Sequence, residues 1–468
     1  MIIQLLYIDE SYLPELEYLC RLFGSIMEET IVPCHVSKFN KESWSIGYCS
    51  KETAPRLADP CRIRICSDDL FWKQYLEKKC PEVLMRKHSE LLTLNSEDSK
   101  AFVMKDKNGI STNLDLFSSA FFMITGMEEV MNPHLRDKHQ RFTFSKSKWA
   151  HLYVNKPLIN SYAQTLLKWI EEVYDVKIPW KRQFTAVLSH DIDSLHFYGR
   201  LRTELVEICN SVKTGGKYTR FSELQGYFAC LLGIQRDPHD TFSYMQEMEG
   251  KRDISATYFI NLSKDNSWGL DLKKYSRTLK KIHGSGNEIA LHPGFDSYCD
   301  REMILYERKR VEALSGATIE GARSHFLRFK NPECYYALSS LGLSYDATMG
   351  YPDREGFKAG ICTPYKPFDI LRREEIDIME IPLVVMDGTL HHYRKQSPET
   401  AQSTIENLIG HVSSCAGVIT LDWHNSFLNE KRGVWRNVYE RSLDSLITHH
   451  ARFLTCGQLA SLWRGRWS

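Results

Sequence analysis

One apolar stretch of this chain ends abruptly in a histidine and two carboxylates. Residues 184–189 are rich in strand-forming types, and His190, Asp191 and Asp193 follow at once. Because side chains on a strand alternate between faces, Asp191 and Asp193 project the same way. Two carboxylates on one face repel each other unless a cation lies between them. The pattern indicates a divalent metal, with one carboxylate as ligand and the other as general base. A solvated strand end, or the DxD motif of a glycosyltransferase, would have the same pattern of residue types.

Further chemical groups follow a later strand-like run. His292 comes after residues 288–291 and before Pro293 and Gly294, whose turn places the imidazole at a rim. Asp296 lies four residues on and could join His292 at one metal. The alternative for Asp296 is an ordinary carboxylate in a loop turn.

Arg323 and His325 have the same i, i+2 spacing as the two aspartates. An arginine beside carboxylates would hold Asp191 ionised and oriented. His325 could be a further ligand or a donor to the substrate. A salt bridge at the rim is the simpler interpretation of this pair.

The run GVITLDWHN, residues 417–425, delivers another carboxylate and imidazole. Asp422 and His424 share a face if the strand is regular. A carboxylate close to an imidazole can fix its tautomer and raise its pKa, which would make His424 a usable general acid. A buried histidine with a hydrogen-bonded partner would have the same pattern.

The elements that must position these groups alternate in type from residue 182 onward. Strand-like runs are predicted at 184–189, 256–262, 288–291, 343–347, 379–385 and 417–423, and helices at 271–283, 302–314, 332–341, 398–413 and 434–450. Such alternation predicts parallel strands with crossover helices. Because many strand ends deliver chemical residues, we expect an α/β fold of the (β/α) barrel type, whose site lies at the carboxyl face of the strands. An open sheet would concentrate ligands at one switch point.

The first part of the chain has a different character. Residues 1–178 mix short strands and helices, with a hairpin signal at Asn108-Gly109 and one long buried helix predicted over 116–131. We find no compact set of chemical residues there. The 468-residue chain is therefore predicted to hold a smaller α+β accessory domain at 1–178 and a barrel at 179–468.

Composition excludes several classes of function. The formal net charge is +1, from 60 basic and 59 acidic residues, which argues against an electrostatic nucleic-acid binder. The N-terminal apolar run lacks a basic leader and meets Asp9 and Glu10 early, so we do not expect a signal peptide. No apolar stretch reaches the ~18 residues of a membrane span. The 13 cysteines contain no CxxC pair and are predicted to be reduced thiols of a cytoplasmic protein.

Taken in order, these motifs resemble a known family. HDID, ATYFI, NEIALHP, the isolated Arg323 and LDWHN look like the motifs of the polysaccharide deacetylase family (carbohydrate esterase family 4) over about residues 183–456. The resemblance implies a metal-dependent de-N-acetylase on a distorted (β/α) barrel. The stretches SSAFFMITGMEEV and KPLIN resemble an N-terminal domain that accompanies some bacterial members.

The resemblance assigns a role to each matching position. It implies that Asp191 is the general base, that Asp193 and His292 are metal ligands, that Arg323 orients the base and that His424 is the general acid. The family's second metal histidine falls at 296, where this chain has Asp296. The implied centre is then Asp-His-Asp, with zinc as the first choice of metal among divalent ions. His196 or His325 could supply the missing imidazole instead.

Four side chains are predicted to contact the substrate: His325, Lys358, Asp422 and Trp423. A long insertion at 195–252 could cover the site or grip an anionic sugar through five basic residues, although a solvated helical pair is the simpler alternative. Those residues are Arg200, Arg202, Lys213, Lys217 and Arg220.

Three functions remain open at this point. The first is hydrolysis of an N-acetylated sugar to acetate and a free amine. The second is a non-catalytic barrel that binds a glycan or a partner in surface polysaccharide synthesis, motivated by the missing histidine. The third is a DxD glycosyltransferase. Without an export signal, the expected substrate is an intracellular precursor or a lipid-linked glycan at the membrane surface. The sequence does not predict an oligomeric state.

Overall fold

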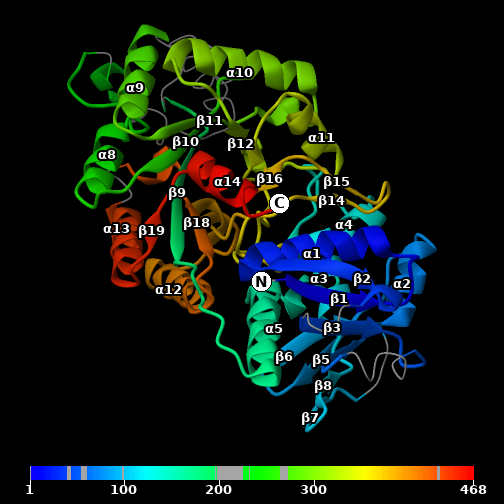
Figure 1. Ribbon diagram of the computed structural model, residues 1–468. Coiled ribbons are helices and arrows are strands. Elements are labelled where there is room, and N and C mark those ends of the chain that lie inside the picture. The colour runs from blue at the N-terminus through cyan, green and yellow to red at the C-terminus, as the bar shows by residue number, and fades with distance from the viewer. Residues whose placement is uncertain are drawn as a thin grey trace.

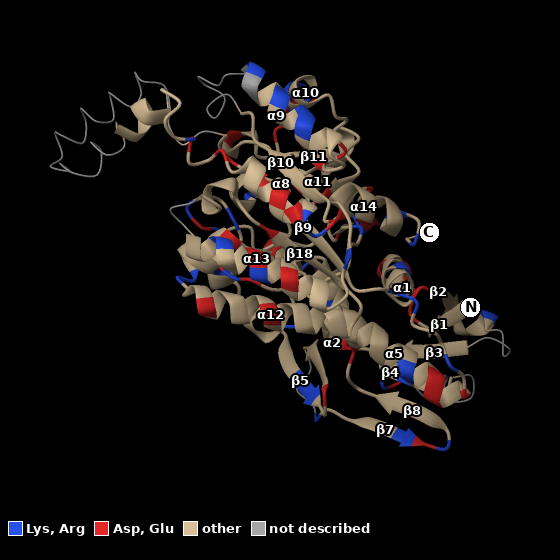
Figure 2. Cartoon of the chain, turned by 90° about the vertical axis from the view of Figure 1, so that its left-hand side faces the viewer, with Lys and Arg blue, Asp and Glu red and all other residues tan. Residues whose placement is uncertain are grey.

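The computed structural model describes residues 2–39, 44–53, 61–96, 100–195, 197, 225–230, 232–263, 272–429 and 433–467. Two sheets organise the chain, and the blue-to-cyan N-terminal part lies beside the green-to-red C-terminal part (Figure 1). Many of the charged residues, blue and red in Figure 2, lie on the helices that surround the sheets and on the hairpin of β7 and β8. Among the described helices, none combines the length and the apolar character that a membrane crossing requires.

The N-terminal sheet has six strands in the order β2-β1-β3-β4-β8-β7. Only β7 runs antiparallel to its neighbour. The strands are β1 (Ile2–Tyr7), β2 (Thr30–His35), β3 (Trp44–Cys49), β4 (Ile63–Cys66), β7 (Val103–Asp106) and β8 (Gly109–Thr112), and a separate hairpin pairs β5 (Leu84–His88) with β6 (Leu91–Asn95). The helices are α1 (Leu13–Met27), α2 (Asp69–Leu76), α3 (Leu116–Ile124), α4 (Met127–Met131) and α5 (Leu158–Tyr174).

Local chemistry explains two features of this part. The Asn108-Gly109 turn joins β7 to β8, as the sequence predicts, and Gly109 has a φ of 123° that favours glycine. The single helix expected over 116–131 is wrong, because the chain breaks into α3 and α4 at Gly126, whose φ is 60°. Helix α3 begins where Asp115 accepts hydrogen bonds from the backbone N–H groups of Phe117 and Ser118.

The C-terminal sheet is a curled, all-parallel half-barrel. Its strands follow the order β16-β13-β12-β11-β10-β9-β18-β17, and β19 also pairs with β9. The strands are β9 (Thr185–Ile192), β10 (Ala256–Ile260), β11 (Glu288–Leu291), β12 (Gly321–Ala322), β13 (Tyr345–Asp346), β16 (Met379–Glu380), β17 (Val385–Met386), β18 (Val418–Asp422) and β19 (Arg452–Phe453). The helices are α8 (Phe242–Gly250), α9 (Leu272–Gly284), α10 (Arg301–Ser315), α11 (Glu333–Ser340), α12 (Pro398–Ser414), α13 (Gly433–Thr448) and α14 (Cys456–Arg464), and a small hairpin pairs β14 (Phe368–Asp369) with β15 (Glu374–Glu375).

The alternation of strands and helices confirms the α/β prediction. Every residue of β9 is buried, as expected for a central parallel strand covered on both faces. The predicted strand over 379–385 is instead two short strands, β16 and β17, which form the two ends of the sheet. Because only a few residues separate them in the chain, the ends of the curled sheet lie near each other.

Ion pairs and hydrogen bonds join the two parts. Arg373 Nε lies 2.7 Å from Oε1 of Glu15, which is fully buried in α1. Lys358 Nζ lies 3.1 Å from Oε2 of buried Glu129. Tyr18 donates a hydrogen bond of 2.9 Å to the carbonyl of Lys366. The N-terminal and C-terminal parts of the chain are therefore packed against each other, while domain limits at 178 and 179 stay a prediction.

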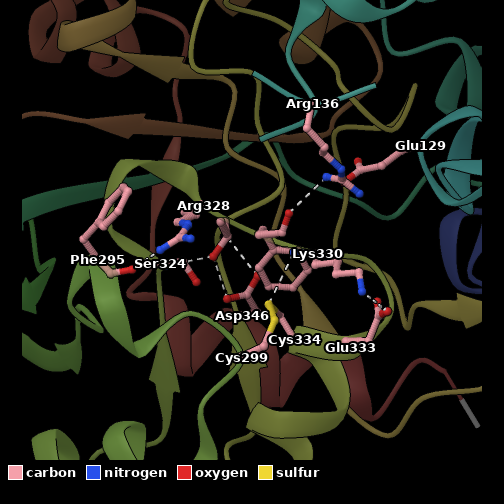
Figure 3. The surroundings of a disulfide bond; sticks show 12 residues. Glu129, Arg136, Phe295, Cys299, Ser324, Arg328, Lys330, Glu333, Cys334 and Asp346 are labelled. Atoms are coloured by element: carbon pink, nitrogen blue, oxygen red, sulfur yellow. Dashed lines mark hydrogen bonds and ion pairs between the residues drawn. A yellow bond between two sulfur atoms is a disulfide. The ribbon is translucent and has the colours of Figure 1, made fainter. Parts of the chain in front are cut away.

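The prediction that all cysteines are reduced is wrong for one pair. Cys299 and Cys334 form a disulfide that ties the loop before α10 to α11 (Figure 3). The Lys330–Glu333 ion pair, 2.6 Å between Nζ and Oε1, lies beside it. Disulfides persist in oxidising environments, so the cytoplasmic localisation inferred from reduced cysteines loses that support.

Candidate metal centre

The carboxyl ends of the parallel strands bring the chemical residues to one rim. Asp193 follows β9, His292 follows β11, Arg323 and His325 follow β12, and His424 follows β18. In the parallel register, Asp191 lies opposite Phe259 of β10, and Asp422 lies opposite Ser189 of β9. Groups that are far apart in the sequence therefore converge.

Three side chains form a group that could hold a metal ion. His292 Nε2 lies 3.0 Å and His325 Nε2 lies 3.2 Å from Asp193 Oδ1, and the potential ligand atoms all lie within 4.8 Å of one another. His292 Nδ1 lies 2.6 Å from the backbone carbonyl of Arg323. With an N–H on Nδ1 donated to that carbonyl, Nε2 would be available to bind an ion once it is deprotonated. One oxygen and two imidazole nitrogens fit the ligand preference of Zn²⁺.

The charge of Asp193 also suits a metal ligand. Burial opposes its ionisation, but the imidazoles of His424, His292 and His325 outweigh that effect. The pKa of Asp193 is therefore held well below its usual range, and the carboxylate is ready to bind a cation.

Asp296 is not part of this group. It lies in the short turn Phe295–Ser297 with its side chain exposed, whereas His325 lies with Asp193 and His292. Among the described residues, the group around Asp193 that could hold an ion is therefore Asp-His-His and does not include Asp296. His196, the other expected source of an imidazole, lies outside the described residues, as do the five basic residues of the 195–252 insertion.

A buried arginine lies between two carboxylates next to the group formed by Asp193, His292 and His325. Arg323 Nη1 lies 2.9 Å from Asp191 Oδ1 and 3.0 Å from Asp422 Oδ1. It also donates to Ser189 Oγ at 2.8 Å, and its Nε donates to the carbonyl of Ala347 at 2.9 Å. Burial would raise the pKa of Asp191, but Arg323 and then the nearby imidazoles lower it below the usual value. Asp191 is therefore an ionised acceptor.

Asp191 has a position distinct from the three potential ligands. Its Oδ2 lies 3.8 Å from His292 Nε2, whereas Asp193 Oδ1 lies 3.0 Å from the same atom. The arrangement leaves Asp191 next to the metal group rather than inside it. That position suits a group that accepts a proton from water at the centre.

His424 has a carboxylate partner that the sequence analysis missed. His424 Nδ1 lies 2.6 Å from Asp387 Oδ1, and its backbone N–H donates to Asp387 Oδ2 at 2.8 Å. Asp422 is farther from Nδ1, at 3.6 Å, and is held by Arg323. Burial would lower the pKa of His424, but Asp387 and then Asp193 raise it well above its usual value. The signal for Asp387 was its position directly after the apolar residues of β17.

The four expected substrate contacts lie in different surroundings, and Asp422 belongs to a second group of potential ligands with Asp191 and His424. Trp423 is fully buried and packs against Tyr439, with ring centroids 5.4 Å apart. Asp422 is fully buried against Arg323. Lys358 pairs with Glu129 between the two parts of the chain. His325, with a side chain 14% exposed, lies in the group with Asp193 and His292.

Comparisons with known proteins complete the description. A model for a family of unknown function, DUF7033, matches residues 4–175. The structure is similar to that of a protein from Mycobacterium smegmatis assigned to the polysaccharide deacetylases, with 13% identity, a TM-score of 0.43 and coverage of 62% of this chain and 93% of that one. It is also similar to a polysaccharide deacetylase of Bacillus cereus, with 10% identity, a TM-score of 0.31 and coverage of 58% and 92%.

A third similar structure is a CE4 family pseudoenzyme from Bacillus anthracis, with 10% identity, a TM-score of 0.32 and coverage of 62% and 71%. The comparison with curated proteins gives no match. We therefore argue the residue roles from the geometry of this chain.

Proposed function

We propose that this chain is a metal-dependent hydrolase of the polysaccharide deacetylase type, which removes the acetyl group from an N-acetylated sugar or glycan intermediate. One observation carries the proposal. An Asp-His-His donor set, a separate buried carboxylate held by Arg323, and an imidazole paired with Asp387 all lie at one rim. These are the three kinds of group that hydrolysis of an amide needs.

Asp193, His292 and His325 would hold the ion. When bound, a divalent metal would supply Lewis-acid polarisation of the amide carbonyl and would acidify a water molecule. Asp191, kept ionised and oriented by Arg323, accepts the proton from the attacking water. The water oxygen then forms the new bond to the carbonyl carbon.

The amine must take a proton as it leaves. His424, protonated, donates it from Nε2, while Asp387 accepts the hydrogen bond from Nδ1–H and stabilises the imidazolium. The C–N bond breaks, and the products are acetate and a free amino sugar. The proton taken up by Asp191 balances the one that His424 gives away.

The two alternatives are weaker than this proposal. The non-catalytic barrel was motivated by the absent second histidine, and His325 supplies an imidazole to the group. A DxD glycosyltransferase would leave His292 and His424 without a role. It would also need Asp191 for a nucleotide-bound metal, although that carboxylate is engaged by Arg323.

Acetate release from N-acetylated chito-oligosaccharides in the presence of Zn²⁺ tests the proposal. We expect Asp191→Asn to lower the rate by about 10²–10⁴-fold, the usual contribution of a general base, without loss of bound metal. Asp296→Asn is the matched control, because it makes the same change at an exposed carboxylate of the same rim. Equal acetate release by Asp191→Asn and the wild type would overturn the assignment of the base.

The metal and the physiological substrate are further parts of the proposal. We propose zinc, because the donor set has one carboxylate and two imidazoles. Metal analysis of the purified protein by mass spectrometry checks this choice. As substrate we propose an N-acetylated sugar precursor or a lipid-linked glycan, and acetate release from each of these classes distinguishes them.

A further inference from the structure

A second cavity lies in the N-terminal part, at the carboxyl edge of its sheet. Its volume is about 490 Å³, within the range of small-molecule sites. Asp9 and Tyr12 line it from the loop after β1, Ser50 and Thr53 line it from the loop after β3, and Trp72 lines it from α2. The residues therefore come from three separate segments that meet above the strands.

The topology marks this place in the sheet. From β1 the chain passes through α1 to β2 on one side, whereas β3 pairs with the other side of β1 and continues toward β4. The direction of winding therefore changes between β1 and β3. In open parallel sheets, the loops diverge at this switch point and leave a crevice in which ligands bind.

Hydrogen bonds on the buried side of the cavity fix the two aromatic rings that line it, Tyr12 and Trp72. The rings of Trp72 and Tyr12 stack, with centroids 4.7 Å apart and an angle of 8° between planes. Trp72 Nε1 donates to the hydroxyl of Tyr48 at 2.6 Å, and Tyr48 donates to Asp115 at 2.7 Å. Asp115 in turn caps α3. The two rings are therefore fixed by a buried chain of hydrogen bonds.

The charge of the cavity selects against phosphate. Among the described residues that line it, Asp9, Asp69 and Glu77 are acidic and Lys73 is basic. The loops at 8–12 and 50–53 contain no glycine, whereas the phosphate-binding turns of dinucleotide folds need glycine for close backbone approach. A nucleotide would meet carboxylates where it needs N–H donors.

We propose that this cavity binds a small hydroxylated ligand with a free amine, of the amino-sugar class. The carboxylates of Asp9 and Asp69 accept from the ammonium and the ring hydroxyls, and Ser50 and Thr53 add neutral polar partners. The side chains of Ile8 and Leu76 contact the C–H groups of the ligand, while the stacked and buried rings of Tyr12 and Trp72 form the floor of the cavity. The proposal rests on this cavity alone and does not require the barrel to be a deacetylase.

Calorimetric titration of the full chain with glucosamine tests the proposal. The titration uses the Asp193→Asn variant, so that binding at the barrel rim does not contribute to the measured heat. We expect Asp9→Asn to weaken binding about tenfold, the effect of one charged hydrogen bond. Asp106→Asn is the matched control, since Asp9 and Asp106 are both exposed and each accepts a backbone N–H two residues on. Asp106 does not line the cavity.

Two further titrations make the result decisive. Ser11→Trp fills the cavity from its exposed wall and should abolish binding. Glucosamine 6-phosphate, whose phosphate adds negative charge, should bind at least about tenfold more weakly than glucosamine. Equal affinities for the Asp9→Asn and Asp106→Asn variants, tighter binding of the phosphate, or no binding of glucosamine would each overturn the proposal.

Discussion

Two parallel sheets in this chain bring polar side chains to their carboxyl edges, with different results. At the barrel rim the groups contact one another, as in the Asp191–Arg323–Asp422 chain and the Asp193–His292–His325 group. At the N-terminal sheet, Asp9 and Asp69 are exposed and line an open cavity. The first arrangement fixes charges before a substrate arrives, as catalysis requires. The second leaves an open volume beside the carboxylates that a ligand could occupy.

The buried carboxylates of the two parts show the same contrast. Burial raises the pKa of Asp115 in the N-terminal part to about 6. Asp191 is buried as well, but Arg323 beside it brings the pKa below the usual value. The barrel thus holds a buried negative charge by placing a cation within 2.9 Å, whereas Asp115 relies on hydrogen bonds alone.

The largest expected effect comes from removing that cation. Arg323→Met would leave Asp191 and Asp422 buried together without a countercharge, so we expect the free energy of unfolding to fall by about 3–5 kcal/mol. Urea denaturation of the full chain measures it. Lys251→Met is the control, because it breaks an exposed pair with Glu247 that contributes about 0.5 kcal/mol or less. Equal losses in the two variants would show that the Arg323 pair is not stabilising.

In the N-terminal part, where no cation among the described residues lies beside buried Asp115, we expect the free energy of unfolding to depend on pH. Because the pKa of Asp115 is raised from 3.8 to about 6, its contribution to stability is present below pH ~4 and is lost as the pH rises through about 6. At about 1.4 kcal/mol per pKa unit, the loss is about 3 kcal/mol. The stability of Asp115→Asn relative to wild type should therefore improve by this amount between pH 4 and 7, measured by denaturant unfolding.

Asp106→Asn controls for the loss of a carboxylate in the same part of the chain. Its charge lies on the exposed turn between β7 and β8, so the same pH-dependent change is not expected there. A constant difference between Asp115→Asn and wild type across this pH range would contradict the prediction.

The contrast between the two edges also explains what the sequence could predict. Asp191, Asp193, His292 and His424 follow long apolar runs, so strand alternation and parallel packing are enough to bring them to one rim. Asp387 was missed because its strand, β17, has two residues and was merged with β16.

Loop geometry limited the prediction more than strand geometry did. The sequence offered both Asp296 and His325 as a third ligand, and the choice depends on the loops: Asp296 lies in an exposed turn, whereas His325 Nε2 lies 3.2 Å from Asp193 Oδ1. The N-terminal cavity escaped notice for a related reason. Its lining residues stand singly in three segments, and only the strand order brings them together.

The assignment of His325 over Asp296 predicts a difference in metal affinity. His325→Ala removes a donor of the Asp-His-His group, so we expect Zn²⁺ affinity to fall by more than the 10- to 100-fold loss typical of an outer partner. Competition with a chromogenic chelator measures the affinity. Asp296→Ala should bind Zn²⁺ as the wild type does, and the reverse order of the two variants would restore the Asp-His-Asp centre.

The smallest expected effect concerns Asp387, the carboxylate that lies closest to the imidazole of His424. Asp387→Asn keeps the shape of the side chain but removes the charge that stabilises the imidazolium, so we expect kcat for acetate release to fall about 10- to 100-fold, as for other residues that orient a catalytic group. KM should change little, because Asp387 is fully buried and does not reach the substrate. Asp387→Glu, which restores the charge, should recover part of the rate. A raised KM with unchanged kcat would instead assign Asp387 to substrate binding and remove the physical basis for His424 as the acid.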